Sequence, residues 1–142
     1  MTQKIIFPFV LVLATTVFVG CGGGVKLTGT VTFEDGTPVE VGTVVFESSG
    51  SISRGDIGSN GEYRVSTIKP GDGIPPGTYN VYLINTEKTE MIPVPGSDGD
   101  FRDITVQTVA SKYLSSATSD LTYTVDRASK TFDFEVEKFS GR

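Results

Sequence analysis

The sequence predicts an all-β fold, a seven- or eight-stranded antiparallel β-sandwich that follows a cleaved signal peptide. Three observations point to this fold. Apolar and polar residues alternate along many short segments, clusters of Gly, Pro, Asn and Asp separate these segments, and no segment shows convincing helical periodicity. Without its signal, the chain of 142 residues would keep about 120, a common size for one domain.

Residues 1–20 have the pattern of a signal peptide. Lys4 makes the start positively charged, and residues 5–19 form an apolar run. The run is short for a membrane-spanning helix and contains Pro8, so a permanent transmembrane segment is the weaker interpretation. An ordinary signal peptide beside an incidental cysteine, or a short uncleaved anchor, stays open as an alternative.

The end of this run, the Phe-Val-Gly-Cys sequence of residues 18–21, resembles the lipobox of bacterial lipoproteins. Phe18 departs from the aliphatic residue that is usual at its position. The resemblance implies that Cys21 is acylated, for example with palmitate, and holds the chain on a membrane. Residues 21–24 would then be the acylated cysteine and a flexible glycine tether. By resemblance to lipoprotein sorting in Gram-negative bacteria, Gly22 implies delivery to the outer membrane.

Residues 25–142 are expected to form the β-sandwich domain. From Val25 to Phe33 every second side chain belongs to one face, and later segments repeat this period of two. The strands that we expect are residues 25–33, 43–47, 52–57, 62–67, 78–85, 121–125 and 132–136, with a further short strand at 104–108. Alternate residues such as Leu27 and Val81 should point into the core, while Tyr82 points to the other face of its strand.

Turn-forming residues predict the connections. Asn60-Gly61 is a strong hairpin signal and should join the strands on either side of it. The prolines and glycines of residues 70–77 exclude a helix or a central strand. Residues 86–103 are polar and contain more Pro and Gly, which predicts a long exposed excursion. Residues 111–120 should be an irregular approach to the last strands.

Composition excludes several classes of function. The chain has 12 basic and 17 acidic residues and no basic cluster, so the electrostatic attraction that drives nucleic-acid binding is missing. It has no histidine and one cysteine, which leaves no usual ligand set for zinc, iron or copper and no usual base for a serine or cysteine nucleophile. Ser–Lys or carboxylate-only catalysis stays open as an alternative, but no spacing of residues points to it. We therefore expect a protein that is not an enzyme and has no cofactor.

Several sequence blocks resemble the carboxypeptidase-regulatory-like, transthyretin-like (prealbumin-like) β-sandwich domains of small bacterial lipoproteins. The blocks lie at residues 29–33, 35–38, 42–46, 61–63 and 70–81. The last block, Pro-Gly-Asp-Gly-Ile-Pro-Pro-Gly-Thr-Tyr-Asn-Val, is the most specific. The resemblance covers residues 25–85 well, is weaker over 86–109, and implies a non-catalytic module at the cell envelope. The histidines and the terminal Tyr-Arg-Gly-Ser signature of transthyretin-like hydrolases are missing here.

Acidic residues in two loops are candidates for binding sites. Asp98, Asp100 and Asp103 could supply oxygen ligands to Ca²⁺, but Arg102 lies among them and the spacing of an EF-hand loop is missing, so a solvated acidic loop is favoured. Asp72, between two glycines, is expected to accept backbone hydrogen bonds and hold a turn.

The five tyrosines could stack on sugars, yet most of them fall on the face expected to be buried, where tyrosine fills core volume. They are Tyr63, Tyr79, Tyr82, Tyr113 and Tyr123. Tyr82 is the one whose position in its strand points elsewhere. The sequence therefore predicts an envelope lipoprotein, attached through Cys21, with a structural or protein-binding sandwich and an envelope protein or polysaccharide as partner. The alternative is a carbohydrate- or calcium-binding module.

Overall fold

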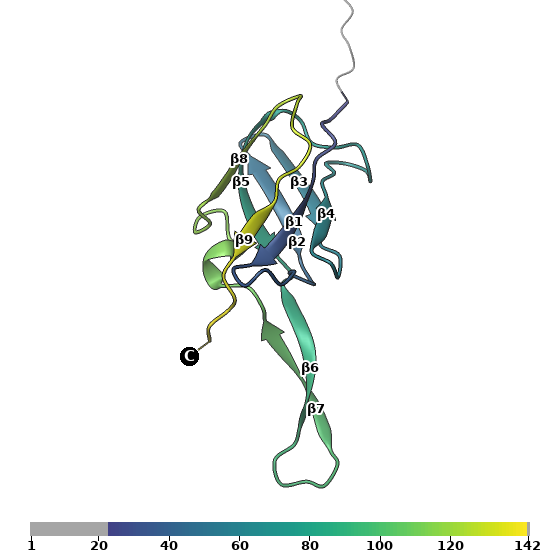
Figure 1. Ribbon diagram of the computed structural model, residues 1–142, viewed down its shortest axis with the longest axis vertical. Helices are drawn as coiled ribbons and strands as arrows, with labels where there is room; N and C mark the ends of the chain where they lie inside the picture. Colours follow the sequence, from purple (N-terminus) through teal and green to yellow (C-terminus); the bar gives the residue numbers. More distant parts are fainter. Residues whose placement is uncertain (1–22, 142) are drawn as a thin grey trace, which may run out of the picture.

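The computed structural model describes residues 23–141, and the signal peptide and Cys21 lie outside them. Two sheets face each other in a sandwich, and a long hairpin projects from one end (Figure 1). The strands are β1 (Thr28–Phe33), β2 (Thr43–Ser48), β3 (Ser51–Asp56), β4 (Glu62–Arg64), β5 (Gly77–Ile84), β6 (Glu87–Pro93), β7 (Phe101–Gln107), β8 (Leu121–Val125) and β9 (Phe134–Val136). The predicted all-β sandwich is confirmed, with seven strands in its two sheets.

The two sheets have the strand orders β4-β1-β9 and β3-β2-β5-β8. Neighbouring strands are antiparallel except for β1 and β9, which pair in parallel from Val31 with Phe134 to Phe33 with Val136. The predicted antiparallel sandwich therefore contains one parallel pair. The reason is that residues 126–133 carry the chain from one sheet to the other instead of turning back in a hairpin, so β9 arrives beside β1 in the same direction.

The core lies between the sheets and is built from the alternate residues that the sequence pattern placed inward. Phe46 of β2 is fully buried, and its ring lies 6.2 Å from the rings of Tyr79 and Phe132 and 6.3 Å from that of Tyr63. Apolar side chains in β1, β5 and β9, or directly before β1, complete the cluster: Leu27, Val31, Phe33, Val81, Leu83, Phe134 and Val136. The predicted inward faces of these strands are confirmed.

The connections differ more from expectation than the strands do. Gly61, with φ of +82°, makes the predicted turn, but β3 and β4 belong to different sheets and meet only through isolated bridges. The irregular approach expected at residues 111–120 begins with a short 3₁₀ helix, η1 (Ser111–Leu114), which buries Tyr113. Within residues 23–141 no helix is long and apolar enough to cross a membrane.

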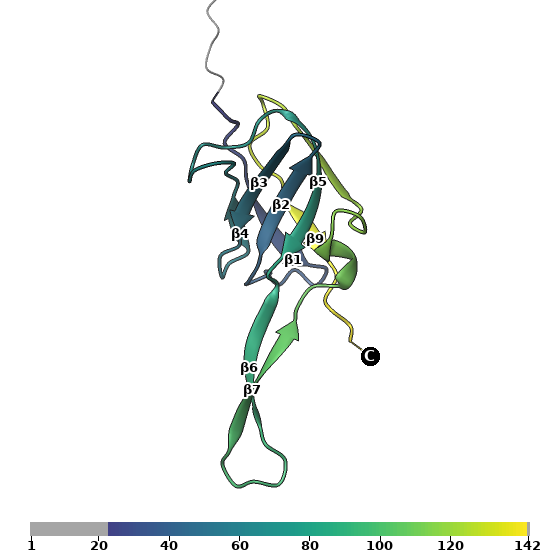
Figure 2. The same ribbon diagram turned by 180° about the vertical axis from the view of Figure 1, so that it is seen from behind.

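The excursion expected at residues 86–103 instead forms most of an ordered hairpin, with β6, the tip loop and the start of β7. β6 and β7 pair without interruption from Glu87 with Gln107 to Pro93 with Phe101. The turn-forming residues misled the prediction because Pro93 ends β6, and Pro95, Gly96 and Gly99 all fall in the tip loop. Figures 1 and 2 show the hairpin leaving the sandwich at the end opposite to the one where the described chain begins.

Candidate functional site

The β6–β7 hairpin stands apart from the core and still carries large apolar side chains. Met91 is 68% exposed and Phe101 is 60% exposed. They are diagonal neighbours on one face, because Met91 lies opposite Asp103 and Phe101 lies opposite Pro93. An isolated two-stranded hairpin is only marginally stable in water, and the exposed apolar groups make this face a candidate surface for contact with another molecule.

The other face of the hairpin is also apolar in part. Ile92, Ile104 and Val106 alternate with the first set along the two strands, and each is half-buried. Cross-strand partners on this face include Arg102, opposite Ile92, and Lys88, opposite Val106. The hairpin thus presents aliphatic or aromatic groups on both faces and an outer edge on each strand.

A cluster of hydrogen bonds fixes the base of the hairpin to the sandwich. The Thr86 side chain is fully buried, and its hydroxyl accepts a hydrogen bond from the Gln107 side-chain amide. The Thr86 carbonyl accepts from the backbone amide of Thr108 at 3.2 Å and from the Thr108 hydroxyl at 2.5 Å. The Thr108 carbonyl in turn accepts a hydrogen bond from the Phe139 amide at 2.9 Å. The hairpin therefore leaves the sandwich from a fixed base rather than from a loose linker.

An open groove of about 450 Å³ lies beside this base. Its apolar part is supplied by Phe33, Pro38, Val41 and Phe139, and Lys88 extends it onto the first strand of the hairpin. Phe139 is 42% exposed. The groove and the hairpin together form one continuous surface at this end of the molecule, which we call the hairpin end.

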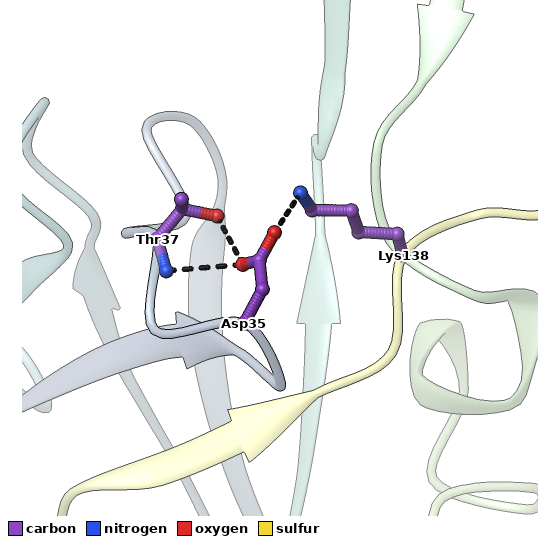
Figure 3. A network of polar contacts seen from close by, with 3 residues as sticks. All are labelled: Asp35, Thr37 and Lys138. Atoms are coloured by element: carbon purple, nitrogen blue, oxygen red, sulfur yellow. Dashed lines mark hydrogen bonds and ion pairs between the residues drawn. The ribbon is translucent and has the colours of Figure 1, made fainter.

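One wall of the groove is held by a polar network around Asp35 (Figure 3). The Lys138 ammonium lies 2.5 Å from Asp35 Oδ2, and Asp35 Oδ1 accepts hydrogen bonds from the hydroxyl and the amide of Thr37 at 2.6 and 3.1 Å. These bonds, that from Lys138 first, hold the pKa of Asp35 well below its usual value. Lys138 also lies 5.2 Å from the centre of the Phe33 ring. The network links the turn after β1 to the chain after β9.

The three carboxylates weighed for Ca²⁺ are spread along the hairpin. Asp98 and Asp100 belong to the exposed tip loop, whereas Asp103 lies within β7 opposite Met91. No group of three or more acidic, cysteine or histidine side chains in residues 23–141 is placed to hold a metal ion. The structure therefore adds nothing in favour of a calcium site here.

Asp72 holds a turn, as expected. Its Oδ1 accepts the Thr67 amide at 2.8 Å, and its Oδ2 accepts the amides of Ile68 and Lys69 at 2.8 and 3.0 Å. These backbone hydrogen bonds, those from Lys69 and Thr67 above all, lower the pKa of Asp72 to about 2. Because both oxygens of this carboxylate accept hydrogen bonds from its own loop, the role of Asp72 is to stabilise the turn.

The tyrosines do not form an open stacking platform. Tyr63, Tyr79 and Tyr113 are buried, and the Tyr79 hydroxyl donates to the Pro75 carbonyl at 2.9 Å. Tyr123 stacks on Phe132 with ring centres 4.1 Å apart. Tyr82 is half-buried on the outer face of β5, opposite Val45.

The sequence interpretation missed the exposed apolar residues of the hairpin. A weak signal was present, since residues 87–93 and 101–107 each contain apolar residues and lie on either side of a Pro- and Gly-containing loop.

Comparisons with protein families, with curated proteins and with solved structures gave no match to this chain.

Proposed function

We propose that this protein is a membrane-anchored lipoprotein of the cell envelope whose β-sandwich is a non-catalytic support for a protein-binding hairpin. One arrangement supports the proposal above all. The described chain begins at Gly23, two positions after Cys21, at one end of the sandwich, and the apolar hairpin leaves from the other end (Figure 1). A lipid on Cys21 would hold the first end at a membrane and present the hairpin away from it.

Acylation of Cys21 accounts for the anchor. Each buried methylene contributes about 0.8 kcal/mol, and two or more acyl chains make attachment stable. We propose in addition that the sandwich is a carboxypeptidase-regulatory-like domain. The membrane that holds the anchor is then the outer membrane.

The chemistry of the hairpin favours a protein as its partner. Between Glu87 and Gln107 the chain carries five acidic and two basic residues around the apolar groups. A partner that covers this surface needs an apolar cleft bordered by basic side chains, and it can add a strand to either edge of the hairpin. Such a partner would bury Met91 and Phe101 together.

The anchor is tested by intact mass and fractionation after expression in a Gram-negative host, with Cys21→Ala as the comparison. We expect the wild-type chain to lose residues 1–20, to gain the mass of acyl chains and to fractionate with membranes. The variant should lose the acyl mass. A wild-type chain that is released without acyl groups would contradict the proposal.

The hairpin is tested by photocrosslinking in the intact envelope of the source cell. A photoreactive residue replaces Thr105, which is exposed on the same face of the hairpin as Phe101, and in a matched control it replaces Ser59 in an exposed turn of the sandwich. We expect one adduct of defined mass from position 105, none from position 59, and loss of the adduct when Met91→Ser and Phe101→Ser are added. Equal adducts from both positions would argue against a docking role for the hairpin.

A further inference from the structure

The end of the sandwich opposite the hairpin holds the start of the described chain firmly. The Val25 amide donates to the Ile74 carbonyl at 2.7 Å, and the Ile74 amide donates back at 2.9 Å. Gly24 fits so closely against this loop that an added Cβ would lie 2.6 Å from the Asp72 carbonyl oxygen. The fixed part of the chain therefore starts only four residues after Cys21, and four residues span at most about 14 Å.

Basic side chains gather around this point. Lys26, Arg127 and Lys130 line an open depression together with Gly23 and Gly24. The Lys26 ammonium donates a hydrogen bond to the Gly71 carbonyl, which brings the neighbouring loop with Lys69 alongside. The whole chain has a formal net charge of −5, so this concentration of cations runs against its general character.

The carboxylates nearby are occupied by their own turns. Asp72 binds the three loop amides described above, and Asp126 Oδ1 accepts the amides of Ala128 and Ser129 at 2.8 Å each. Asp72 and Asp126 keep their negative charges while they accept these bonds, and the four cations, Lys26, Lys69, Arg127 and Lys130, outnumber them. The outcome is a locally positive surface on an acidic protein.

A large apolar side chain projects from the loop that Lys26 contacts through Gly71. Ile68 is 91% exposed, and the bond from its amide to Asp72 holds it in the loop beside Lys69. An exposed aliphatic group bordered by lysines and arginines is the composition of a surface that rests on a bilayer, with cations at the headgroups and the apolar group below them.

We propose that Lys26, Ile68, Lys69, Arg127 and Lys130 form a membrane-contacting surface that rests on anionic lipid headgroups. This inference rests on the proposed anchor at Cys21, because the short tether is what keeps this end within reach of the bilayer. The contact gives the domain one orientation, with the β6–β7 hairpin pointing away from the lipid (Figures 1 and 2).

The sequence contains no tryptophan, so a single introduced indole reports its own surroundings. The acylated protein is purified as Ile68→Trp and, as the matched control, as Met91→Trp on the hairpin. Both replaced side chains are largely exposed. Each variant is reconstituted on vesicles of equal parts phosphatidylethanolamine and phosphatidylglycerol with brominated acyl chains. We expect blue-shifted emission and loss of most of the fluorescence for Ile68→Trp, and neither change for Met91→Trp.

Two further comparisons identify the source of the effect. Adding Lys69→Glu and Lys130→Glu to Ile68→Trp, or replacing the lipids by brominated phosphatidylcholine, should restore most of the fluorescence while the protein still floats with the vesicles. Flotation with equal quenching at positions 68 and 91, or with none at 68, would overturn the membrane-contacting surface and leave the anchor intact. A protein that fails to float would remove the anchor itself, and this inference with it.

Discussion

The Tyr63 hydroxyl donates a 2.5 Å hydrogen bond to the carbonyl of Phe132, and this bond passes directly over Gly29 of β1. A Cβ on Gly29 would lie 2.0 Å from the Phe132 oxygen and 2.7 Å from the tyrosine hydroxyl. Burial raises the pKa of Tyr63 above its usual value, so its hydroxyl remains a donor across the neutral range. The bond joins β4 to the chain that enters β9, with β1 between them.

Gly29→Ala should therefore destabilise the fold by about 1–3 kcal/mol, because backbone and a buried hydroxyl must move to admit the methyl group. Urea unfolding measures the change. Gly50→Ala is the matched control, since nothing lies within 4 Å of a Cβ built at Gly50. Equal stability of the two variants would show that the close approach over Gly29 carries no energetic weight.

Tyr63→Phe should lower the free energy of unfolding by about 0.5–1.5 kcal/mol, since it removes one hydrogen bond and keeps the buried ring. The same urea titration detects it. The loss of unfolding free energy in the Gly29→Ala, Tyr63→Phe double variant should be smaller than the sum of the losses in the two single variants, because both changes act on one contact. Full additivity would mean that the hydroxyl and the glycine are independent.

Lowering the pH should loosen the loop that Asp72 holds. The pKa of Asp72 is about 2 in the folded protein against a usual 3.8, so its contribution to stability is complete above about pH 4 and is lost as the pH falls through 2. The difference in melting temperature between wild type and Asp72→Asn should be largest at pH 7 and should shrink toward pH 2. Asp98→Asn, in the exposed hairpin tip, should show no such convergence. A constant difference for Asp72→Asn at all pH values would rule out this linkage.

The Asp35–Lys138 pair should respond to salt. Both side chains are about half exposed, so their attraction is weakened by mobile ions. Asp35→Asn should lower the melting temperature at low ionic strength, and the deficit should narrow in about 1 M salt, where screening acts over only a few ångströms. A deficit that stays the same in salt would assign the effect to the Thr37 hydrogen bonds instead.

Thr86→Val should loosen the base of the hairpin while keeping the shape of the side chain. Loss of the bond from Gln107 removes about 1 kcal/mol of local stability. Native-state hydrogen exchange should show faster exchange across β6 and β7 and little change in β2 and β5. Lys88→Val, on the hairpin itself, is the comparison that leaves the base untouched. If exchange in the hairpin did not change with Thr86→Val, the buried hydroxyl would have no role in holding it.

The strands and the inward faces could be predicted because they depend on residues close together in sequence. The alternation from Val25 to Phe33 predicts which side chains of β1 are buried. The Gly-Asp-Gly sequence around Asp72 predicts that its carboxylate stabilises a turn. Both patterns lie within a few residues, and the structure agrees with them.

The parallel pairing of β1 with β9 could not be predicted, because nothing near Val31 encodes a partner about a hundred residues away. The hairpin surface was missed for a different reason. Met91 and Phe101 sit among polar residues on a segment with no buried face, so the contrast that reveals a strand in a core is weak there. Cys21 could be read only as a motif, and the structure does not describe it.

The pairing of the first strand with the last also sets the order in which the molecule can assemble. β2, β3 and β5 can pair as soon as residue 84 is available, but β1 keeps one edge free until Phe134 has joined the chain. Contacts between residues so far apart in sequence form slowly, because a long loop must close before they stabilise anything. Completion of the sandwich is therefore a late step in folding, and a chain that ends before β9 would leave the edge of β1 open to pairing with another molecule.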